Sequence, residues 1–295
     1  MNNQKMAAQL RRMMKEKEII YTVGVGDALA AKIACATEGI DAILSSGFSV
    51  SACMYGLPDA EFYTRSENAL AVKAMCDVSN KPIIADIDTG YGNAVTVIHS
   101  VNEFEKAGAA AVIIEDQVSP KRCPISVNTE NKLISLKEAV GKIRAAVENR
   151  LNKDTVIIAR TDSPTYEMAL ERALAFKEVG ADAIQIYSGA YNDAAGAKRI
   201  QEEVGLPLSL IVCGRLEVWT KEDIEFIKPK FAQFALAPVN VATKAMMDAC
   251  AYIGKNKTTV GMPTQSVEHM VIQNLLGMDR VEKLQLEYLP SEEEL

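Results

Sequence analysis

The stretch Pro82-Ile-Ile-Ala-Asp-Ile-Asp-Thr-Gly-Tyr-Gly-Asn93 is the most informative part of this sequence. Its first four residues are the kind of short apolar run found in a strand that is buried on both faces. The run ends in Asp86 and Asp88, and side chains two apart in an extended strand point the same way. Two glycines that permit tight turns follow. The stretch therefore predicts a buried strand that ends in two carboxylates and a turn.

The same arrangement recurs twice further along the chain. One apolar run, residues 110–114, ends in Glu115 and Asp116. Another, residues 155–159, ends in the group 160–162, which contains an arginine and an aspartate. Charged residues at the carboxyl ends of parallel strands are typical of the active site of a barrel. Ordinary solvated turns are the competing interpretation, and three such endings favour a site.

Carboxylates dominate these strand ends, and no histidine lies among them. Such a set suits a hard cation that prefers oxygen ligands. Asp86, Asp88 and Glu115 are therefore candidate ligands for Mg²⁺, bound directly or through water, with Mn²⁺ as the alternative ion.

Composition excludes several classes of protein. The formal net charge of -7 and the pI of about 5.1 leave no basic footprint for nucleic acid. No apolar run approaches the roughly 20 residues of a membrane span, and the amino terminus lacks a secretory apolar core. Six cysteines lack metal-ligand spacing, so we expect reduced thiols in a cytoplasmic protein. Only two histidines are present, which argues against a zinc site or a histidine-based triad.

Strand and helix patterns alternate through most of the chain. Eight strand-helix units predict parallel pairing and a (β/α)8 barrel, also called a TIM barrel, over residues 1–254. A doubly wound open sheet is the alternative, but no Gly-x-Gly-x-x-Gly turn follows the first strand. Residues 255–295 form a helical extension with expected helices at 266–275 and 279–286. Its apolar residues are expected to pack on another subunit, with packing on the chain's own barrel as the alternative.

Two further residues are candidates for chemistry. Arg160 is placed to bind a substrate carboxylate or phosphonate by a two-pronged contact, or else to pair with Asp162 or Glu115. Cys123 lies on a long polar loop, and nearby positive charge lowers the pKa of a thiol. Such a cysteine can transfer a proton from a closing loop, or it can be a bystander.

Six motifs in order resemble the isocitrate lyase / phosphoenolpyruvate mutase superfamily. They are Ser46-Gly47-Phe48, Pro58-Asp59, Ala85 to Asn93, Glu115-Asp116-Gln117, Lys121-Arg122-Cys123 and Ala159-Arg160-Thr161-Asp162. The resemblance covers roughly residues 23–187 and implies a magnesium-dependent barrel that binds 2-oxo or 2-hydroxy acids. It also implies a tetramer in which the eighth helix is exchanged between subunits.

The resemblance assigns roles to individual residues. It implies that Asp86, Asp88 and Glu115 serve the metal, and that Asp59 lies near metal and substrate. The substrate-binding residues implied or mapped in this way are Ser46, Gly47, Phe48, Asp59, Arg160 and Tyr187. The catalytic residues are Lys121, Cys123 as general acid, and Arg160.

The chain also departs from both branches of the superfamily. The lyases continue their Lys-Arg-Cys or Lys-Lys-Cys loop motif with Gly-His, whereas Pro124 and Ile125 stand here. Tyr187 occupies the place of a glutamate expected in the lyases. The asparagine and threonine of the phosphonate enzymes are absent from the loop.

Three functions follow as hypotheses. The first is a magnesium-dependent carbon-carbon lyase that cleaves a 2-hydroxy di- or tricarboxylate of the 2-methylisocitrate or dimethylmalate type. The second is phosphorus-carbon chemistry on phosphonopyruvate, or hydrolysis of oxaloacetate. The third is a binding protein that has kept the fold and lost the chemistry, and the intact carboxylates argue against it.

Overall fold

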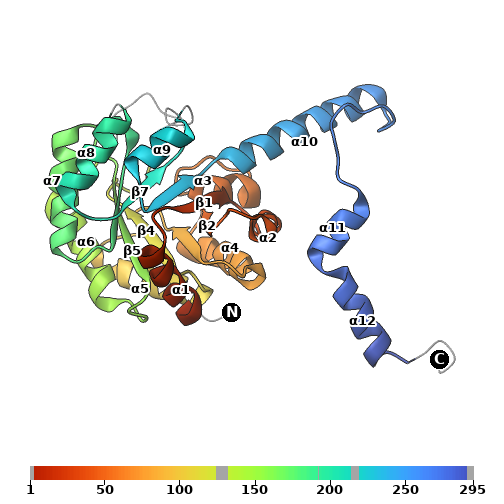
Figure 1. Ribbon diagram of the computed structural model, residues 1–295, viewed down its shortest axis with the longest axis horizontal. Coiled ribbons are helices and arrows are strands. Elements are labelled where there is room, and N and C mark those ends of the chain that lie inside the picture. Colours follow the sequence, from red (N-terminus) through yellow and green to blue (C-terminus); the bar gives the residue numbers. More distant parts are fainter. Residues whose placement is uncertain (1–2, 124–131, 192, 214–218, 291–295) are drawn as a thin grey trace. The chain divides into compact units, whose positions relative to one another are not determined.

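A closed barrel of eight parallel strands forms the body of the protein (Figure 1). The computed structural model describes residues 3–123, 132–191, 193–213 and 219–290. The strands follow one another around the barrel in chain order, and β1 closes it by pairing with β8. The predicted (β/α)8 barrel is therefore confirmed.

The strands are short, and each is followed by at least one helix. Their bounds are β1 Ile20–Val25, β2 Ala42–Ser45, β3 Ile83–Asp86, β4 Ala111–Glu115, β5 Val156–Thr161, β6 Ala183–Ile186, β7 Leu208–Ile211 and β8 Phe231–Phe234. The helices are α1 Asn3–Glu16, α2 Ala28–Ala36, α3 Gly47–Val50, η1 Ser51–Tyr55, α4 Arg65–Val78, α5 Ala94–Ala107, α6 Leu136–Asn149, α7 Tyr166–Glu178, η2 Ser188–Ala190, α8 Ala194–Val204, α9 Lys221–Ile227, α10 Ala237–Asn256, α11 His269–Leu276 and α12 Met278–Tyr288.

Burial explains why these runs become strands. Strands β4 and β5 are buried at every residue, as expected for parallel strands with helices outside and a packed interior within. Capping residues then set the helix starts. Asp27 accepts a hydrogen bond from Ala30 N at 2.8 Å, and Thr220 forms a capping box at the start of α9.

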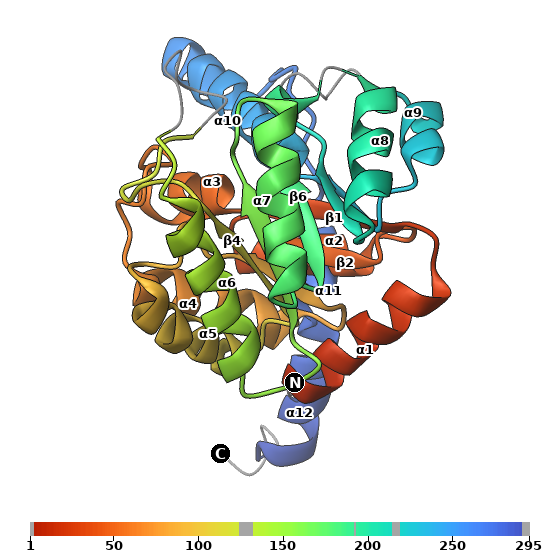
Figure 2. The same ribbon diagram turned by 90° about the vertical axis from the view of Figure 1, so that its left-hand side faces the viewer.

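Helix α1 packs its apolar stripe across the end of the barrel opposite the strands' carboxyl ends. Met6, Leu10 and Met13 are buried in one cluster with residues at the amino-terminal ends of the strands, such as Ile20 and Ala111. Figure 2 shows α1 beside the lower end of the strands, away from the α3 end. The opposite, carboxyl end therefore remains available for a site.

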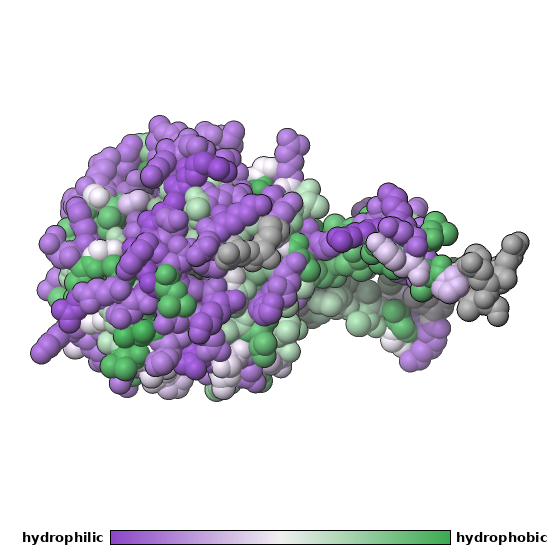
Figure 3. Space-filling model, turned by 90° about the horizontal axis from the view of Figure 1, so that it is seen from below, coloured by the Kyte–Doolittle hydropathy of each residue, from purple (hydrophilic) through white to green (hydrophobic). Residues whose placement is uncertain are grey.

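The chain divides into two compact units, Met1–Val239 and Asn240–Leu295. We expected the division after residue 254, but α10 begins at Ala237 and runs on as one helix through the boundary. None of the residues in α10, α11 and α12, all of which the structure describes, is buried. Apolar side chains therefore remain on the surface of the second unit, as Figure 3 shows.

No helix among the described residues combines the length and the apolar character needed to span a bilayer.

Candidate active site at the carboxyl end of the barrel

Asp86 and Asp88 lie together at the end of β3, but not because both belong to the strand. The strand ends at Asp86, and Asp88 adopts a left-handed backbone conformation with φ 51°. The backbone N–H of Asp88 donates to Asp86 Oδ1 at 3.0 Å, which fixes this turn. The two carboxylates lie together as predicted, but the turn at Asp88 aligns them and not an extended strand. Gly47 lies against both groups, since a Cβ there would be 3.1 Å from Asp88 Oδ1 and 3.2 Å from Asp86 Oδ2.

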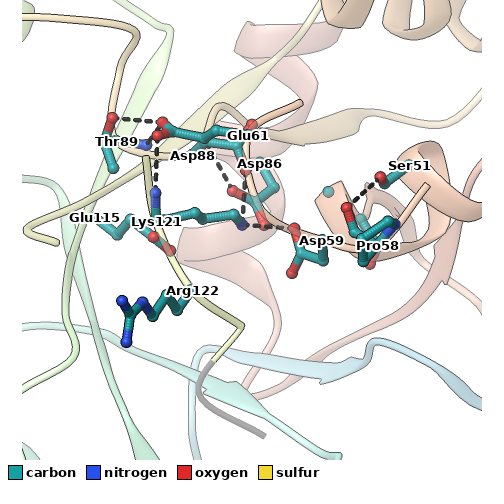
Figure 4. Close-up of polar contacts among 12 residues, drawn as sticks. Ser51, Pro58, Asp59, Glu61, Asp86, Asp88, Thr89, Glu115, Lys121 and Arg122 are labelled. Carbon is teal, nitrogen blue, oxygen red and sulfur yellow. Dashed lines mark hydrogen bonds and ion pairs between the residues drawn. The ribbon is translucent and has the colours of Figure 1, made fainter. Parts of the chain in front are cut away.

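The ammonium group of Lys121 lies between two carboxylates (Figure 4). Its Nζ is 2.6 Å from Asp88 Oδ1 and 3.0 Å from Asp59 Oδ1. Burial lowers the pKa of Lys121, but Asp59 and Asp88 outweigh this effect and raise that pKa well above its usual range. Burial raises the pKa of Asp88 to about 6, although the neighbouring Lys121 opposes the shift. Lys121, expected to be catalytic, thus belongs to the carboxylate cluster.

Arg160 pairs with both acids that the sequence offered as alternatives to a substrate. Its Nη1 lies 3.0 Å from Glu115 Oε2, while Nε and Nη2 bind the two oxygens of Asp162 at 2.8 and 2.9 Å. Strand register explains the first contact, because Glu115 and Arg160 are directly paired on β4 and β5. Burial raises the pKa of Glu115 well above its usual range, even though Arg160 lowers it.

The carboxylates suit a cation by their chemistry. Asp59 Oδ1, Asp88 Oδ1 and both oxygens of Glu115 are buried, and among the described residues the cations Lys121 and Arg160 pair with these carboxylates. Such oxygen donors fit Mg²⁺. Among the described residues, however, no three histidine, cysteine, aspartate or glutamate side chains are arranged to hold a metal. The ligand set Asp86, Asp88 and Glu115 therefore stays a prediction.

The expected substrate-binding turn is the start of a helix. Ser46 is the N-cap of α3, and its Oγ accepts from Ser49 N at 3.4 Å. Gly47 opens this helix beside the carboxylates, and Phe48 follows it half-buried. Tyr187 follows β6, with its backbone N–H bonded to Thr161 O at 2.9 Å. The structure brings Gly47 and Asp59 into the cluster, and the substrate-binding roles of all these residues stay predictions.

The segment that carries Cys123 is ordered by Gln117. The side chain of Gln117 donates to Asp162 Oδ2 and to Arg122 O, and it accepts from Arg122 N at 3.0 Å. Cys123 is buried, with 8% of its surface exposed. Its role as general acid stays a prediction, and the Pro124-Ile125 departure lies outside the described residues.

Three further residues near the carboxylate cluster, Asn68, Tyr91 and Glu61, were not predicted as functional from the sequence. Asn68 on α4 donates to Asp86 O at 3.0 Å and to the Tyr91 hydroxyl at 2.8 Å. Tyr91 in turn donates to Asp88 Oδ2 at 2.8 Å. A signal for Asn68 exists, because it shares the buried stripe of α4 with Val72 and Met75, where an amide needs a partner. Glu61, which accepts four hydrogen bonds, carries no such signal.

Comparison with known proteins shows the family to which this chain belongs. The family model described as phosphoenolpyruvate phosphomutase matches residues 10–254. A 2,3-dimethylmalate lyase of Eubacterium barkeri is 37% identical over 287 residues, which cover 96% of this chain and 98% of that protein. The similarity extends through both compact units.

Solved structures agree at the level of the fold. A phosphoenolpyruvate phosphomutase from Streptomyces platensis subsp. rosaceus superposes with a TM-score of 0.89 at 27% identity, covering 96% of this chain and 99% of that one. A phosphonopyruvate hydrolase in complex with oxalate and Mg²⁺ gives a TM-score of 0.85 at 28% identity, covering 98% and 100%. Named relatives include lyases, which supports the expected enzyme class.

Proposed function

Because this chain belongs to the phosphoenolpyruvate phosphomutase family, within the isocitrate lyase superfamily, we propose that it is a magnesium-dependent carbon-carbon lyase. Its substrate would be a 2-hydroxy di- or tricarboxylate of the dimethylmalate or 2-methylisocitrate type. The products would be a 2-oxo acid and a carboxylate. The observation that carries the proposal is the cluster of buried carboxylate oxygens at Asp59, Asp88 and Glu115, which the structure pairs with the Lys121 ammonium and the Arg160 guanidinium.

Each residue has a task in this reaction. Asp86, Asp88 and Glu115 would hold Mg²⁺, which when bound would supply positive charge that stabilises negative charge on the substrate. The substrate 2-hydroxyl would give its proton to solvent as its oxygen becomes the 2-oxo group, and the bond between C2 and C3 would break with its electron pair left on C3. The Cys123 thiol would then donate a proton to that carbon, and the resulting thiolate would regain a proton from solvent.

Recognition of the substrate would fall to the groups around the cluster. The backbone N–H groups at the start of α3, at Gly47 and Phe48, would bind one substrate carboxylate. Arg160 would hold the remote carboxylate through its guanidinium, which Asp162 already orients by a two-pronged contact. Tyr187 stands in place of a glutamate and would shape the pocket for a different substrate.

Phosphorus-carbon chemistry on phosphonopyruvate, or hydrolysis of oxaloacetate, is the second candidate. Tyr187 favours it, since the glutamate expected in the lyases is missing from this position. The similarity to a phosphonopyruvate hydrolase also supports it.

A substrate panel tests the proposal. The full-length protein is assayed with saturating Mg²⁺ on 2,3-dimethylmalate, 2-methylisocitrate, oxaloacetate and phosphonopyruvate. A lyase produces a 2-oxo acid from one of the first two, and chelator removes this activity while Mg²⁺ or Mn²⁺ restores it. Turnover of only phosphonopyruvate or oxaloacetate moves the assignment to the second candidate.

We also propose a cytoplasmic homotetramer in which the second unit packs on a neighbouring subunit. Apolar side chains that are more than half exposed, such as Val241, Met270 and Leu286, support this proposal.

A further inference from the structure

Glu61 occupies an unusual position in the connection that precedes α4. Its backbone is left-handed with φ 52°, a conformation that residues with a side chain seldom adopt. Such a conformation persists when surrounding contacts hold it, and it often marks a functional site. The contacts of Glu61 are therefore worth following.

The two carboxylate oxygens of Glu61 bind two separate segments (Figure 4). Oε1 accepts from the backbone N–H of Thr89 at 3.1 Å and from its hydroxyl at 2.5 Å. Oε2 accepts from the Ser119 hydroxyl at 2.7 Å and from the Lys121 backbone N–H at 3.0 Å. An ionised carboxylate, which only accepts, matches these four groups.

Together with the Lys121–Asp88 ion pair, these bonds link Glu61, Thr89, Asp88 and Lys121 in a closed ring. Thr89 directly follows Asp88, and the Lys121 side chain reaches Asp88 at 2.6 Å. Glu61 joins the backbones of Thr89 and Lys121 from the other side. The ammonium of Lys142 fixes the same turn by donating to Thr89 O at 3.1 Å. Lys142 therefore holds the Thr89 turn without the help of Glu61, whereas Glu61 links the backbone of Lys121 to that turn.

We propose that Glu61 is a positioning residue that acts through Lys121. Its carboxylate fastens the Lys121 backbone to the Thr89 turn and so holds the Lys121 ammonium between Asp59 and Asp88. An effect of Glu61 on catalysis depends on the proposed function, whereas its effect on the position of Lys121 does not.

Glutamine at this place can keep only one of the two backbone contacts. In Glu61→Gln the amide oxygen can accept from either the Thr89 or the Lys121 backbone N–H, and the hydroxyl on the other side can turn to accept from the amide N–H₂ group. The backbone N–H on that other side can only donate, so it faces another donor and loses its bond. Glu61→Ala removes the contacts on both sides.

Hydrogen exchange of the full-length protein measures these contacts without any substrate. A hydrogen bond to a charged group slows local opening by about 10- to 100-fold. We expect Glu61→Ala to lose protection by about that factor at both the Thr89 and Lys121 amides. Glu61→Gln should lose it at one of these two amides and keep it at the other.

Acetylation by acetic anhydride, followed by peptide mass spectrometry, reports on the Lys121 ammonium itself. In the native protein only 3% of the Lys121 surface is exposed, so its acetylation is slow. We expect Glu61→Ala to accelerate it by about tenfold or more, because the Lys121 backbone is no longer fastened to the Thr89 turn. Unchanged acetylation of Lys121 in Glu61→Ala overturns the proposal, whatever the enzyme turns over.

Glu67→Ala is the matched control. Glu67 lies in the same part of the chain, and its carboxylate accepts hydrogen bonds from the Thr64 backbone N–H and hydroxyl, at 2.7 and 2.8 Å. Its loss weakens the start of α4 but should leave exchange and acetylation at Lys121 unchanged. An equal effect of Glu67→Ala would show that general loosening, not positioning, exposes Lys121, and would also overturn the proposal.

Kinetics then link the positioning to the reaction. On whichever substrate the panel identifies, Glu61→Ala should lower kcat about 10- to 100-fold with a smaller change in KM, and Glu61→Gln should fall between. An increase of KM alone contradicts a positioning role in the chemical step. If no panel substrate is turned over, the proposed function fails while exchange and acetylation still decide the role of Glu61.

Discussion

The carboxylate of Asp86 gives the most direct test of the metal site. Asp86 is half-buried at the rim of the barrel, so Asp86→Ala should abolish activity without unfolding the protein. Activity and thermal unfolding by circular dichroism are measured with and without Mg²⁺. Asp77→Ala is the control, because Asp77 is exposed on α4 and pairs only with Lys73 among the contacts found there. Full activity of Asp86→Ala in chelator would refute the metal assignment.

Cys123 separates the two candidate reactions. A hydroxyl is a far weaker acid than a thiol, so Cys123→Ser should lower the kcat of a lyase by about 10²- to 10⁴-fold. Substrate binding should change little, because Arg160 and the metal would hold the substrate. Steady-state kinetics with saturating Mg²⁺ check this, with the exposed Cys53→Ser as control. Near-normal turnover would remove Cys123 from the mechanism and favour the second candidate.

Some of the residues at the site could be placed from the sequence, and others could not. Asp86, Glu115 and Arg160 could be placed because each ends an apolar run, and parallel strands end at one rim. The contacts of Arg160 with Glu115 and Asp162 were foreseen as an alternative. Glu61 could not be foreseen, because its partners lie 28 and 60 positions away and only the folded chain brings them together.

At the scale of the element, α4 supports the turn after β3 through one side chain. Asn68→Leu keeps the volume but leaves the Asp86 carbonyl and the Tyr91 hydroxyl without their donor. A buried group left unpaired in this way costs about 1–3 kcal/mol. We therefore expect a Tm lower by several degrees in calorimetry, together with reduced activity. Ser66→Ala, exposed on the same helix, should have no effect, and an unchanged Tm for Asn68→Leu would contradict this role.

The elements themselves were largely predictable. Short apolar runs such as residues 110–114 predict strands with two buried faces. Asp27 and Thr220 cap the helices that they precede. The sequence did not indicate that the segment after β2 forms α3 and η1. The left-handed Asp88 was also not predicted. Both depend on tertiary contacts around the site, such as the approach of Gly47 to Asp88, which local sequence does not encode.

At the scale of the whole molecule, the helical extension was predicted to start at residue 255, while the second compact unit starts at Asn240. Periodicity indicates helices in residues 255–295, and α10 begins before that segment, at Ala237. Helical periodicity reports which residues share a face and not which partner covers that face. The apolar residues of the second unit are consistent with an interface, and their partner must be found by experiment.

Deletion of residues 262–295 tests the proposed assembly. The deleted segment carries exposed apolar residues, including Met270 and Leu284, that would be buried between subunits. We expect the truncated protein to dissociate or aggregate, as measured by light scattering coupled to size exclusion. Leu284→Glu in the full-length chain is the milder variant, and it should weaken the same contact without removing the segment. Glu282→Lys, which changes an exposed charge on α12, serves as its control. If truncated and Leu284→Glu proteins stay soluble with the same number of subunits as the native protein, the second unit does not hold the assembly together.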